Sequence, residues 1–195
     1  MINSIPPTDR RSEILDAAIR AFARKGYGGS TLADIAVEAG VSQPRISQVF
    51  GTKENAFVEA YLKAAGEILD MIRAHAQPPY ERKDLGDAYQ ALVNRRPEIF
   101  LMIFQGLTSF YVPAIGRTCR WLITEIVDIV TGSGGTPEDA RDLLERAFFV
   151  HAMMASAMVD HVPDHPGVQA MLASVGLGRE AANPDSPESA TPGAS

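Results

Sequence analysis

Apolar residues recur at helical spacing along nearly the whole chain, and no stretch shows the apolar-polar alternation that is typical of a β-strand. This pattern predicts an all-α fold. The first helix is expected from about Thr8 or Asp9 to Lys25, because its apolar residues share one face and Gly26 provides a C-terminal stop. Later helices are expected at 53–74, from Asp84, at 97–111, from Pro113, at 137–161 and at 168–175.

Two short helices with a sharp corner between them are expected after the first helix. Thr31 should cap the first of the two, with Asp34 completing a capping box. Gly40 permits the positive φ that ends this helix. Ser42 should then cap the next helix, whose first turn tolerates Pro44. This arrangement is a helix-turn-helix.

The second of these short helices has one apolar face and one polar face. Ile46, Val49 and Phe50 lie at i, i+3 and i+4 and should face the core. An arginine fork and two side-chain amides then point outward on a helix of about two turns, which is the size that enters the major groove of DNA. The outward residues are Gln43, Arg45, Ser47 and Gln48.

Residues 8 to about 60 resemble the TetR family of transcriptional regulators. The resemblance rests on a helix ending in GYGGST, the segment LADIAVEAGVSQP, a short helix ending at Phe50, and TKENAF at the start of the next helix. It implies a helix-turn-helix DNA-binding domain at residues 8–55 and a larger helical domain at 56–176 that binds a small effector and dimerises. Residues 177–195 have the composition of a disordered tail.

The same resemblance assigns roles to side chains. Thr31 and Lys53 match phosphate-contacting positions, and the outward face of the second short helix matches the base-reading positions. Ser47 and Val49 stand where the family usually has aromatics. Either the Ser47 hydroxyl reaches a phosphate, or the site reads a base edge through a smaller contact. The predicted DNA-binding residues are Thr31, Ser42, Gln43, Pro44, Arg45, Ser47, Gln48 and Lys53.

Aromatic and methionine residues gather in the second part of the chain, where core packing is the default interpretation. Segment 97–111 is apolar over most of its circumference, which predicts burial on nearly all sides, Phe110 and Tyr111 included. If a cavity lies there, it would take a largely apolar ligand, and a tryptophan in place of Gly106 would fill it. The candidate pocket residues are Tyr89, Phe100, Phe104, Gln105, Trp121, Phe148, His151 and Met154.

Dimerisation is expected on the helix at 137–161, which carries apolar residues on two faces. Small residues, among them Ala155 and Ala157, would let two helices approach closely. The helix at 168–175 is the expected partner in a four-helix dimer interface, as in the family. An operator that is a near-palindrome follows from such a two-fold dimer.

Composition limits the remaining possibilities. A chain of 195 residues with 46% apolar content fits one large or two small domains. The net charge is −6, but residues 1–63 carry +1 and the remainder −7, so DNA should meet the N-terminal part first. A single cysteine, Cys119, excludes a disulfide within the chain, and no segment reads as a signal peptide or membrane span. A cytoplasmic location without membrane contact is expected.

No group of residues indicates catalysis. HVPDH at 161–165 fits a polar helix-end loop better than a metal site, and GSGG at 132–135 follows a helix and lacks a P-loop lysine. We therefore expect no enzyme, no cofactor and no metal. The prediction is a homodimeric repressor released from its operator by a small, largely apolar effector. The alternative is a helical ligand-binding or interaction protein without sequence-specific DNA binding, because the N-terminal charge is weak and the aromatics are missing.

Overall fold

The computed structural model describes residues 7–177, with side chains from residue 10 onward. Every regular element in this range is an α-helix, which confirms the predicted all-α fold. The helices are α1 (Pro7–Gly29), α2 (Leu32–Ala39), α3 (Gln43–Phe50), α4 (Lys53–His75), α5 (Arg82–Arg95), α6 (Pro97–Thr108), α7 (Pro113–Gly132), α8 (Pro137–Ala155) and α9 (Pro166–Ala173).

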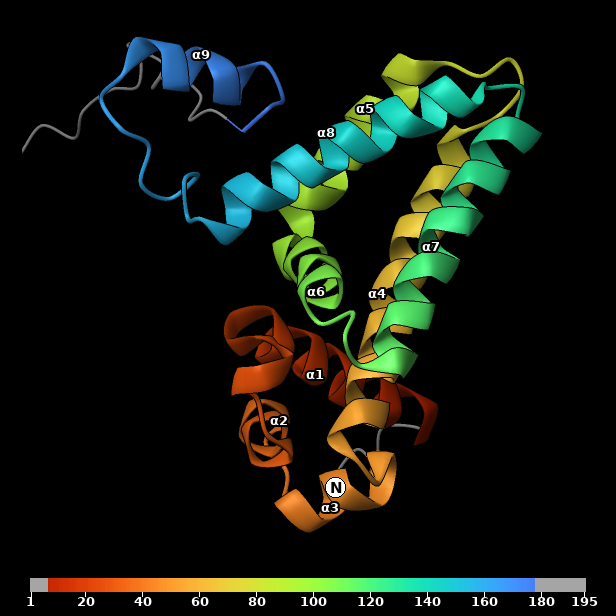
Figure 1. The fold of residues 1–195 in the computed structure, drawn as a ribbon. Coiled ribbons are helices and arrows are strands. Elements are labelled where there is room, and N and C mark those ends of the chain that lie inside the picture. The colour runs from red at the N-terminus through yellow and green to blue at the C-terminus, as the bar shows by residue number, and fades with distance from the viewer. Residues whose placement is uncertain (1–6, 178–195) are drawn as a thin grey trace, which may run out of the picture.

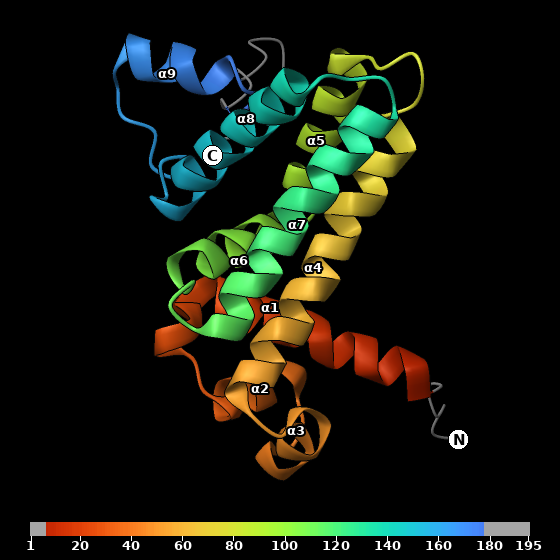
Figure 2. The same cartoon turned by 45° about the vertical axis from the view of Figure 1, so that its right-hand side comes forward.

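The helices form an N-terminal bundle and a larger C-terminal part (Figure 1). Helices α1 to α3 make the bundle, and α3 lies at its outer tip. Helix α4 leaves the bundle and runs beside α7, an arrangement that both views show (Figure 2). Helix α6 packs on α1 and joins the two parts, while α8 packs against α6 and α7. Helix α9 lies beyond the C-terminal end of α8.

Glycines and a capping box determine where the first helices begin and end. Helix α1 is interrupted at Gly26, whose φ of 68° is accessible to glycine, so the regular helix ends where the sequence predicts. The capping box of Thr31 and Asp34 is present: the Thr31 hydroxyl accepts from the Asp34 backbone N, and the Asp34 carboxylate accepts from the Thr31 backbone N. Gly40 ends α2 with a φ of 62°. The predicted corner is therefore confirmed.

The starts of α3 and α5 differ in detail from the prediction. Ser42 occupies the N-cap position of α3, but its side chain makes no capping hydrogen bond. Helix α5 begins at Arg82 with Glu81 before it, so Asp84 lies inside the first turn rather than at the cap. An acidic residue in the first turn still interacts favourably with the helix dipole, which is why Asp84 gave a misleading signal.

The expected helix at 97–111 is shorter than predicted. Helix α6 ends at Thr108, where the Ser109 backbone N bonds to the Gly106 carbonyl three residues back and tightens the last turn. Phe110 and Tyr111 follow in the turn before α7 and are 69% and 65% exposed. The prediction that they are buried is therefore wrong, because it assumed that the helix continues to residue 111, whereas the helix ends before them.

The helix expected at 137–161 also ends early. Helix α8 stops at Ala155, and Ala157 has a φ of 54°, a left-handed conformation that glycine usually provides. The Met158 backbone N bonds to the Met153 carbonyl across this residue, which closes the helix end. Because the sequence has no glycine here, it carried no stop signal. Residues 178–195 of the predicted tail lie outside the described residues, whereas Leu177 packs against the core.

One apolar core runs through both parts of the molecule, and α4 is shared between them. Phe57 of α4 meets Phe22 of α1 edge to face, with ring centroids 4.9 Å apart. Farther along the same helix, Ile68 and Ile72 are buried in the C-terminal part. With 23 residues, α4 spans about 34 Å and crosses the expected domain boundary at 55/56 without a break.

Candidate functional site

Helix α3 presents a polar surface to solvent at the tip of the N-terminal bundle. Ile46 and Phe50 are buried and anchor the helix, as predicted, while Val49 is half-buried. The opposite side is solvated: Gln43, Pro44, Arg45 and Gln48 are exposed, together with Ser42 before the helix. Ser47 is half-buried. The predicted DNA-facing residues on α3 thus lie together on one accessible surface.

The charges of the bundle are distributed unevenly. Between residues 10 and 53, five of the seven Lys and Arg side chains pair with a carboxylate, and the two that do not are Arg45 and Lys53. Arg45 is exposed on α3 and makes no ion pair with any described residue. The uncompensated positive charge of the bundle therefore lies on and beside α3.

Lys53 is held in place at the start of α4. Its Nζ donates to the Tyr27 carbonyl oxygen at 2.9 Å and lies 4.5 Å from the centre of the Tyr27 ring, within cation–π range. Since an ammonium has three donors, others remain for a second acceptor. Thr31 is exposed, and its hydroxyl is engaged with Asp34 of the capping box.

Ion pairs fix α2, and with it the corner, against α1. Arg20 donates to Glu38 at 2.7 Å and Arg24 bonds to the other oxygen of the same carboxylate, which holds the pKa of Glu38 below its usual range. Lys25 bonds to Asp34 at 2.5 Å and, with the Thr31 bonds, lowers the pKa of Asp34 to about 2. The charged side chains on the polar face of α1 thus hold α2, and with it the turn between α2 and α3, in place.

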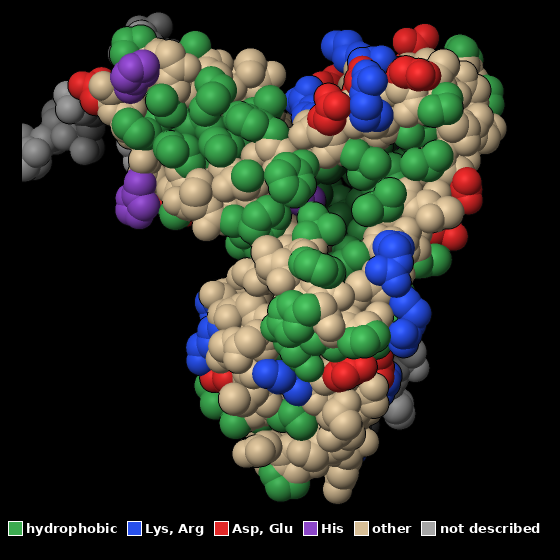
Figure 3. Space-filling view, viewed as in Figure 1, with side chains coloured by type: hydrophobic (Ala, Val, Ile, Leu, Met, Phe, Trp, Pro, Cys, Tyr) green, Lys and Arg blue, Asp and Glu red, His purple; other side chains and the backbone are tan. Residues whose placement is uncertain are grey.

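A cavity of about 250 Å³ lies in the C-terminal part, among α4, α5, α6, α7 and α8. Figure 3 shows a hollow between these helices, surrounded by hydrophobic side chains. The lining is almost entirely apolar. The lining residues are Tyr61, Ile68, Ile72, Tyr89, Ile103, Leu107, Cys119, Leu122, Ile123, Ile126, Leu143, Leu144, Ala147, Phe148 and His151.

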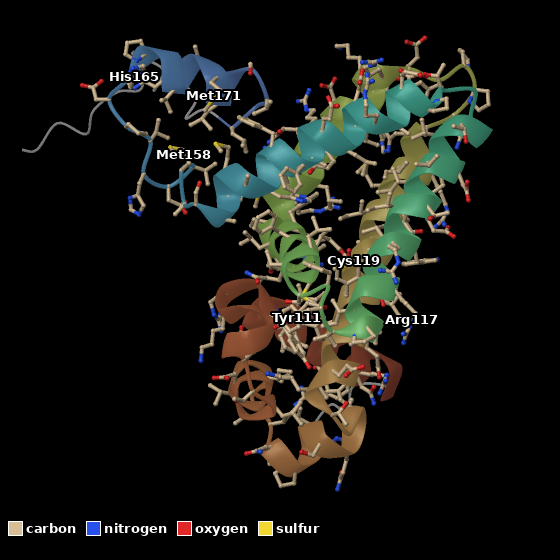
Figure 4. All side chains as sticks on the ribbon, in the orientation of Figure 1. Tyr111, Arg117, Cys119, Met158, His165 and Met171 are labelled. Atoms are coloured by element: carbon tan, nitrogen blue, oxygen red, sulfur yellow. The ribbon has the colours of Figure 1, made fainter. Side chains whose placement is uncertain are left out.

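Two polar pairs lie in the cavity wall. The Tyr89 hydroxyl and His151 Nε2 are 3.2 Å apart, and both residues are buried. Burial lowers the pKa of His151 to about 4 and raises the pKa of Tyr89, so both are neutral at pH 7. Cys119, which projects from α7 (Figure 4), lies beside Tyr61 against Gly106, and burial raises the pKa of its thiol.

The structure brings only some of the predicted pocket residues to the cavity. Tyr89, Phe148 and His151 line it. Phe100 packs edge to face on Tyr89, with ring centroids 5.1 Å apart, and the ring centroids of Phe104 and Phe148 are 6.1 Å apart. Neither Phe100 nor Phe104 lines the cavity.

Three other predicted pocket residues lie elsewhere. Gln105 points at Gly26 of α1, where an added Cβ would meet its Oε1 at 2.7 Å. Trp121 is 38% exposed, and Met154 borders a separate hollow beside Val159. Helical periodicity marks all of these as apolar or inward-facing, but it does not say which neighbour each side chain meets.

The sequence also predicts that Ile68 and Ile72, on the apolar face of the helix at 53–74, lie beside the pocket, and both line the cavity. Tyr61 of the same helix was not predicted to line it, because its position marks it only as core. Leu143 and Ala147 follow from the phase of α8. A periodicity signal exists for all of them, but the sequence does not say which part of the core is hollow.

Gly106 does not border free space. A Cβ added there would lie 2.3 Å from Tyr61 Cε2 and 2.9 Å from Cys119 Sγ. Gly106 therefore allows α6 to approach α4 and α7 closely. The expectation that tryptophan at this position fills the cavity is wrong, since even an alanine would displace Tyr61.

An ion cluster that the sequence did not reveal joins the two parts. Arg96, between α5 and α6, bonds to Asp16 of α1 at 2.9 Å, to Glu67 of α4 at 3.1 Å and to Glu98 at 2.6 Å. Lys63 of α4 bonds to the same Asp16 and Glu67. The five side chains are each roughly a quarter exposed, so the cluster is partly shielded from water.

Within residues 7–177 no three His, Cys, Asp or Glu side chains are placed to hold a metal ion together. None of the described helices combines the length and apolar character needed to cross a membrane.

Comparison with known proteins gives a sequence match for the N-terminal part. Residues 14–60 match the family model described as bacterial regulatory proteins, tetR family. The chain is 36% identical over 66 residues to the HTH-type transcriptional repressor AcnR of Corynebacterium glutamicum, covering 34% of this chain and 35% of AcnR. It is 38% identical over 76 residues to the HTH-type transcriptional regulator BetI of Brucella abortus, covering 37% of this chain and 38% of BetI. The matches thus span little more than a third of these relatives.

Comparison of structures extends over most of the chain. The crystal structure of a TetR family member from Streptomyces coelicolor A3 superposes with a TM-score of 0.62 and covers 86% of this chain and 98% of that chain. The sequence identity is 19%, so this likeness shows the fold alone. The shared fold includes the cavity-bearing helices as well as the N-terminal bundle.

Proposed function

We propose that this chain, a TetR-family protein by the sequence match of residues 14–60, is a transcriptional regulator that binds operator DNA through α3. The observation that carries the proposal is the surface of α3: buried Ile46 and Phe50 anchor the helix while Arg45 and the side-chain amides face solvent. Among the described residues of the bundle, the two positive charges without a carboxylate partner are Arg45 on this surface and Lys53 beside it at the start of α4. AcnR and BetI, which align with this region, are described as a transcriptional repressor and a transcriptional regulator.

The geometry of the bundle suggests which residues contact bases and which contact phosphates. Arg45 has a free guanidinium and can donate two parallel hydrogen bonds to a guanine edge. Lys53 is held by Tyr27 at the base of α4 and suits a phosphate, which requires a charge but no base-specific geometry. Thr31, at the N-terminus of α2, is placed where backbone N–H groups also favour a phosphate.

A genomic footprint of the purified protein tests this proposal. We expect protection of a near-palindromic site and binding that weakens steeply as salt is raised, because phosphate contacts release counterions. Equal binding to all sequences, or no binding, would contradict it. Either result would support the alternative, a helical ligand-binding or interaction protein that does not read DNA.

We propose further that the protein acts as a homodimer through α8 and α9. Figure 3 shows hydrophobic side chains gathered over these helices, and Met158 and Met171 lie in this region (Figure 4). A groove along α8 is lined by Val127 of α7 and, on α8, by Phe149 and Ala152, with Arg141 and Glu145 among its other lining residues. One copy of a two-turn helix buries too little surface to hold a specific site, so a second copy is required.

Release from DNA by an effector completes the proposal. The cavity is lined by Ile68 and Ile72 of α4, the helix that carries Lys53 at its other end. A ligand that prefers a different position of α4 would change the placement of α3, and this preference is the only means by which it can shift the equilibrium. We therefore propose that the protein is a repressor and that a small, largely apolar molecule releases it from DNA.

A further inference from the structure

We infer that the cavity binds a neutral molecule of about ten non-hydrogen atoms with an apolar skeleton and one hydroxyl or carbonyl group that bonds to the Tyr89–His151 pair. This inference deepens the proposed function, because it names the chemical class of the effector. Binding itself is independent of that proposal, since a cavity can hold a ligand whether or not the protein binds DNA.

The size of the ligand follows from the volume. An apolar cavity of about 150 Å³ holds one benzene molecule, with six non-hydrogen atoms. The cavity here is about 250 Å³, which scales to about ten such atoms. Ile123 and Phe148 line the cavity and are also 41% and 57% exposed, so it reaches the surface and a ligand can enter without unfolding.

The charge of the ligand follows from the lining. None of the fifteen lining side chains is an Asp, Glu, Lys or Arg. The one imidazole, His151, is buried and stays neutral at pH 7. A carboxylate or ammonium in this cavity would lose its hydration without an ion-pair partner among the lining side chains, since Arg146, whose charge acts on Tyr89, lies outside the lining. The lost hydration costs far more than the apolar contacts return.

The single polar group follows from the hydrogen-bonding capacity of the wall. Tyr61 and Cys119 are neighbours in the wall against Gly106, so their polar atoms can serve one another. A neutral imidazole and a tyrosine hydroxyl each have one donor and at least one acceptor, and the Tyr89–His151 bond uses one of each. The other ring nitrogen of His151 has no partner among the described residues. Because the imidazole can change tautomer, the pair can meet either a donor or an acceptor on the ligand.

A matched series of probes tests the inference on the full chain without DNA. The probes are 4-propylphenol, propylbenzene, 4-propylbenzoate and 4-propylbenzylammonium, which share one skeleton. Calorimetric titration should show that 4-propylphenol binds and that propylbenzene binds roughly five- to tenfold more weakly, for want of one hydrogen bond. The two ions should show no binding. Absence of binding by 4-propylphenol, or equal affinity for either ion, would overturn the inference.

Variants assign the binding to this cavity. Tyr89→Phe and His151→Phe should each reduce the preference for 4-propylphenol over propylbenzene while leaving the affinity for propylbenzene nearly unchanged. Ala147→Phe, whose ring would occupy the cavity, should abolish binding of both probes. Ala91→Phe adds the same ring on the exposed side of α5 and is the matched control. Unchanged binding by Ala147→Phe, or a full preference retained by Tyr89→Phe, would contradict the assignment.

The outcomes separate this inference from the proposed function. If 4-propylphenol binds as expected but operator affinity does not change, the ligand class stands and effector release fails. If the protein binds its operator specifically but the ions bind as well as the phenol, the DNA-binding proposal stands and the ligand class is wrong.

Discussion

At the scale of single residues, burial and partnering decide which groups are available for function. Arg45 is exposed with a free guanidinium, whereas Lys53 is half-buried and bonded to Tyr27. His151 is buried with its pKa lowered, so it contributes a hydrogen bond to the cavity wall but no charge at neutral pH. Two predictions follow from these differences.

Replacement of Arg45 and of Lys53 should affect DNA binding in different ways. Arg45→Ala should cost about 1–3 kcal/mol on the operator and relax specificity at one position, because it removes a base contact. Lys53→Ala should weaken all sequences and reduce the salt slope, because it removes a phosphate contact. Fluorescence anisotropy on operator and random DNA measures both. Arg10→Ala, an exposed arginine paired with Glu13, is the control, and equal losses on both DNAs for Arg45→Ala would refute its role.

His151 should make the folded state sensitive to acid. Its pKa is about 4 when folded and about 6.5 in the unfolded chain, so the unfolded chain binds the proton first as pH falls. The free energy of unfolding should therefore decrease from pH 6.5 to pH 4, by about 3 kcal/mol from this residue alone. Urea unfolding of wild type and His151→Phe across this window measures the difference. Parallel pH profiles for the two proteins would show that His151 does not contribute.

At the scale of helices, two features determine contacts that helical periodicity does not specify: the Arg96 ion cluster and the groove along α8. The Arg96 cluster ties α1, α4 and α6 together through partly shielded ion pairs. The groove along α8 is open, and its lining is mainly apolar, with Arg141 and Glu145 as its charged members. The cluster bears on the stability of the fold, and the groove bears on the proposed association of two copies.

Arg96→Gln should destabilise the fold by about 2 kcal/mol. Among the described residues it leaves Asp16 and Glu67 with Lys63 as their cation and Glu98 with none, and unpaired charges away from water are costly. The control is Lys83→Gln, which breaks the exposed pair with Asp87 and should cost less than about 0.5 kcal/mol. Urea unfolding at pH 7 compares them. Equal effects would mean that the cluster is worth no more than a surface pair.

Ala155→Arg should impair dimerisation without unfolding the monomer. Ala155 is exposed at the end of α8, one turn beyond Ala152 of the groove, so an added guanidinium meets no described core atom but would be buried in the proposed interface. Ala157, the other position predicted for this purpose, lies outside α8. Analytical ultracentrifugation should show a monomer for Ala155→Arg and a dimer for wild type and Ala91→Arg. A tight operator complex formed by a stable wild-type monomer would end the dimer proposal.

At the scale of the whole molecule, α4 connects the N-terminal bundle with the cavity. Lys53 begins the helix beside α3, and Ile68 and Ile72 line the cavity about 22–29 Å farther along. A rigid helix with both ends packed can transmit a displacement. Coupling between the two sites is then a free energy that acts equally in both directions.

Saturating ligand should weaken operator binding roughly 5- to 150-fold, which corresponds to a coupling free energy of about 1–3 kcal/mol. Saturating operator should weaken ligand binding by the same factor. Titrations of 4-propylphenol with and without operator, and of operator with and without 4-propylphenol, measure the two factors. Unequal factors would indicate that the two ligands do not share one equilibrium, and a bound ligand without effect on DNA would rule out the coupling.

The sequence by itself determined the local structure of this protein and the family that its N-terminal part resembles. Helical periodicity gave the all-α fold, and the capping box at Thr31 with a glycine at Gly40 gave the corner before α3, because caps and turns depend on a few neighbouring residues. The resemblance to the TetR family, drawn from segments in this region, is confirmed by the match at residues 14–60. Errors arose where a helix ended without its usual signal, as at Ala157.

Only the tertiary structure decided which side chains meet. The cavity selects Tyr89, Phe148 and His151 from the predicted pocket residues and leaves Gln105 facing α1. The Arg96 cluster joins residues that are far apart in the chain. Periodicity shows that a side chain faces inward, but the partner it meets depends on how neighbouring helices cross and how closely they approach. Those relations are set by packing over the whole molecule, so no local pattern records them.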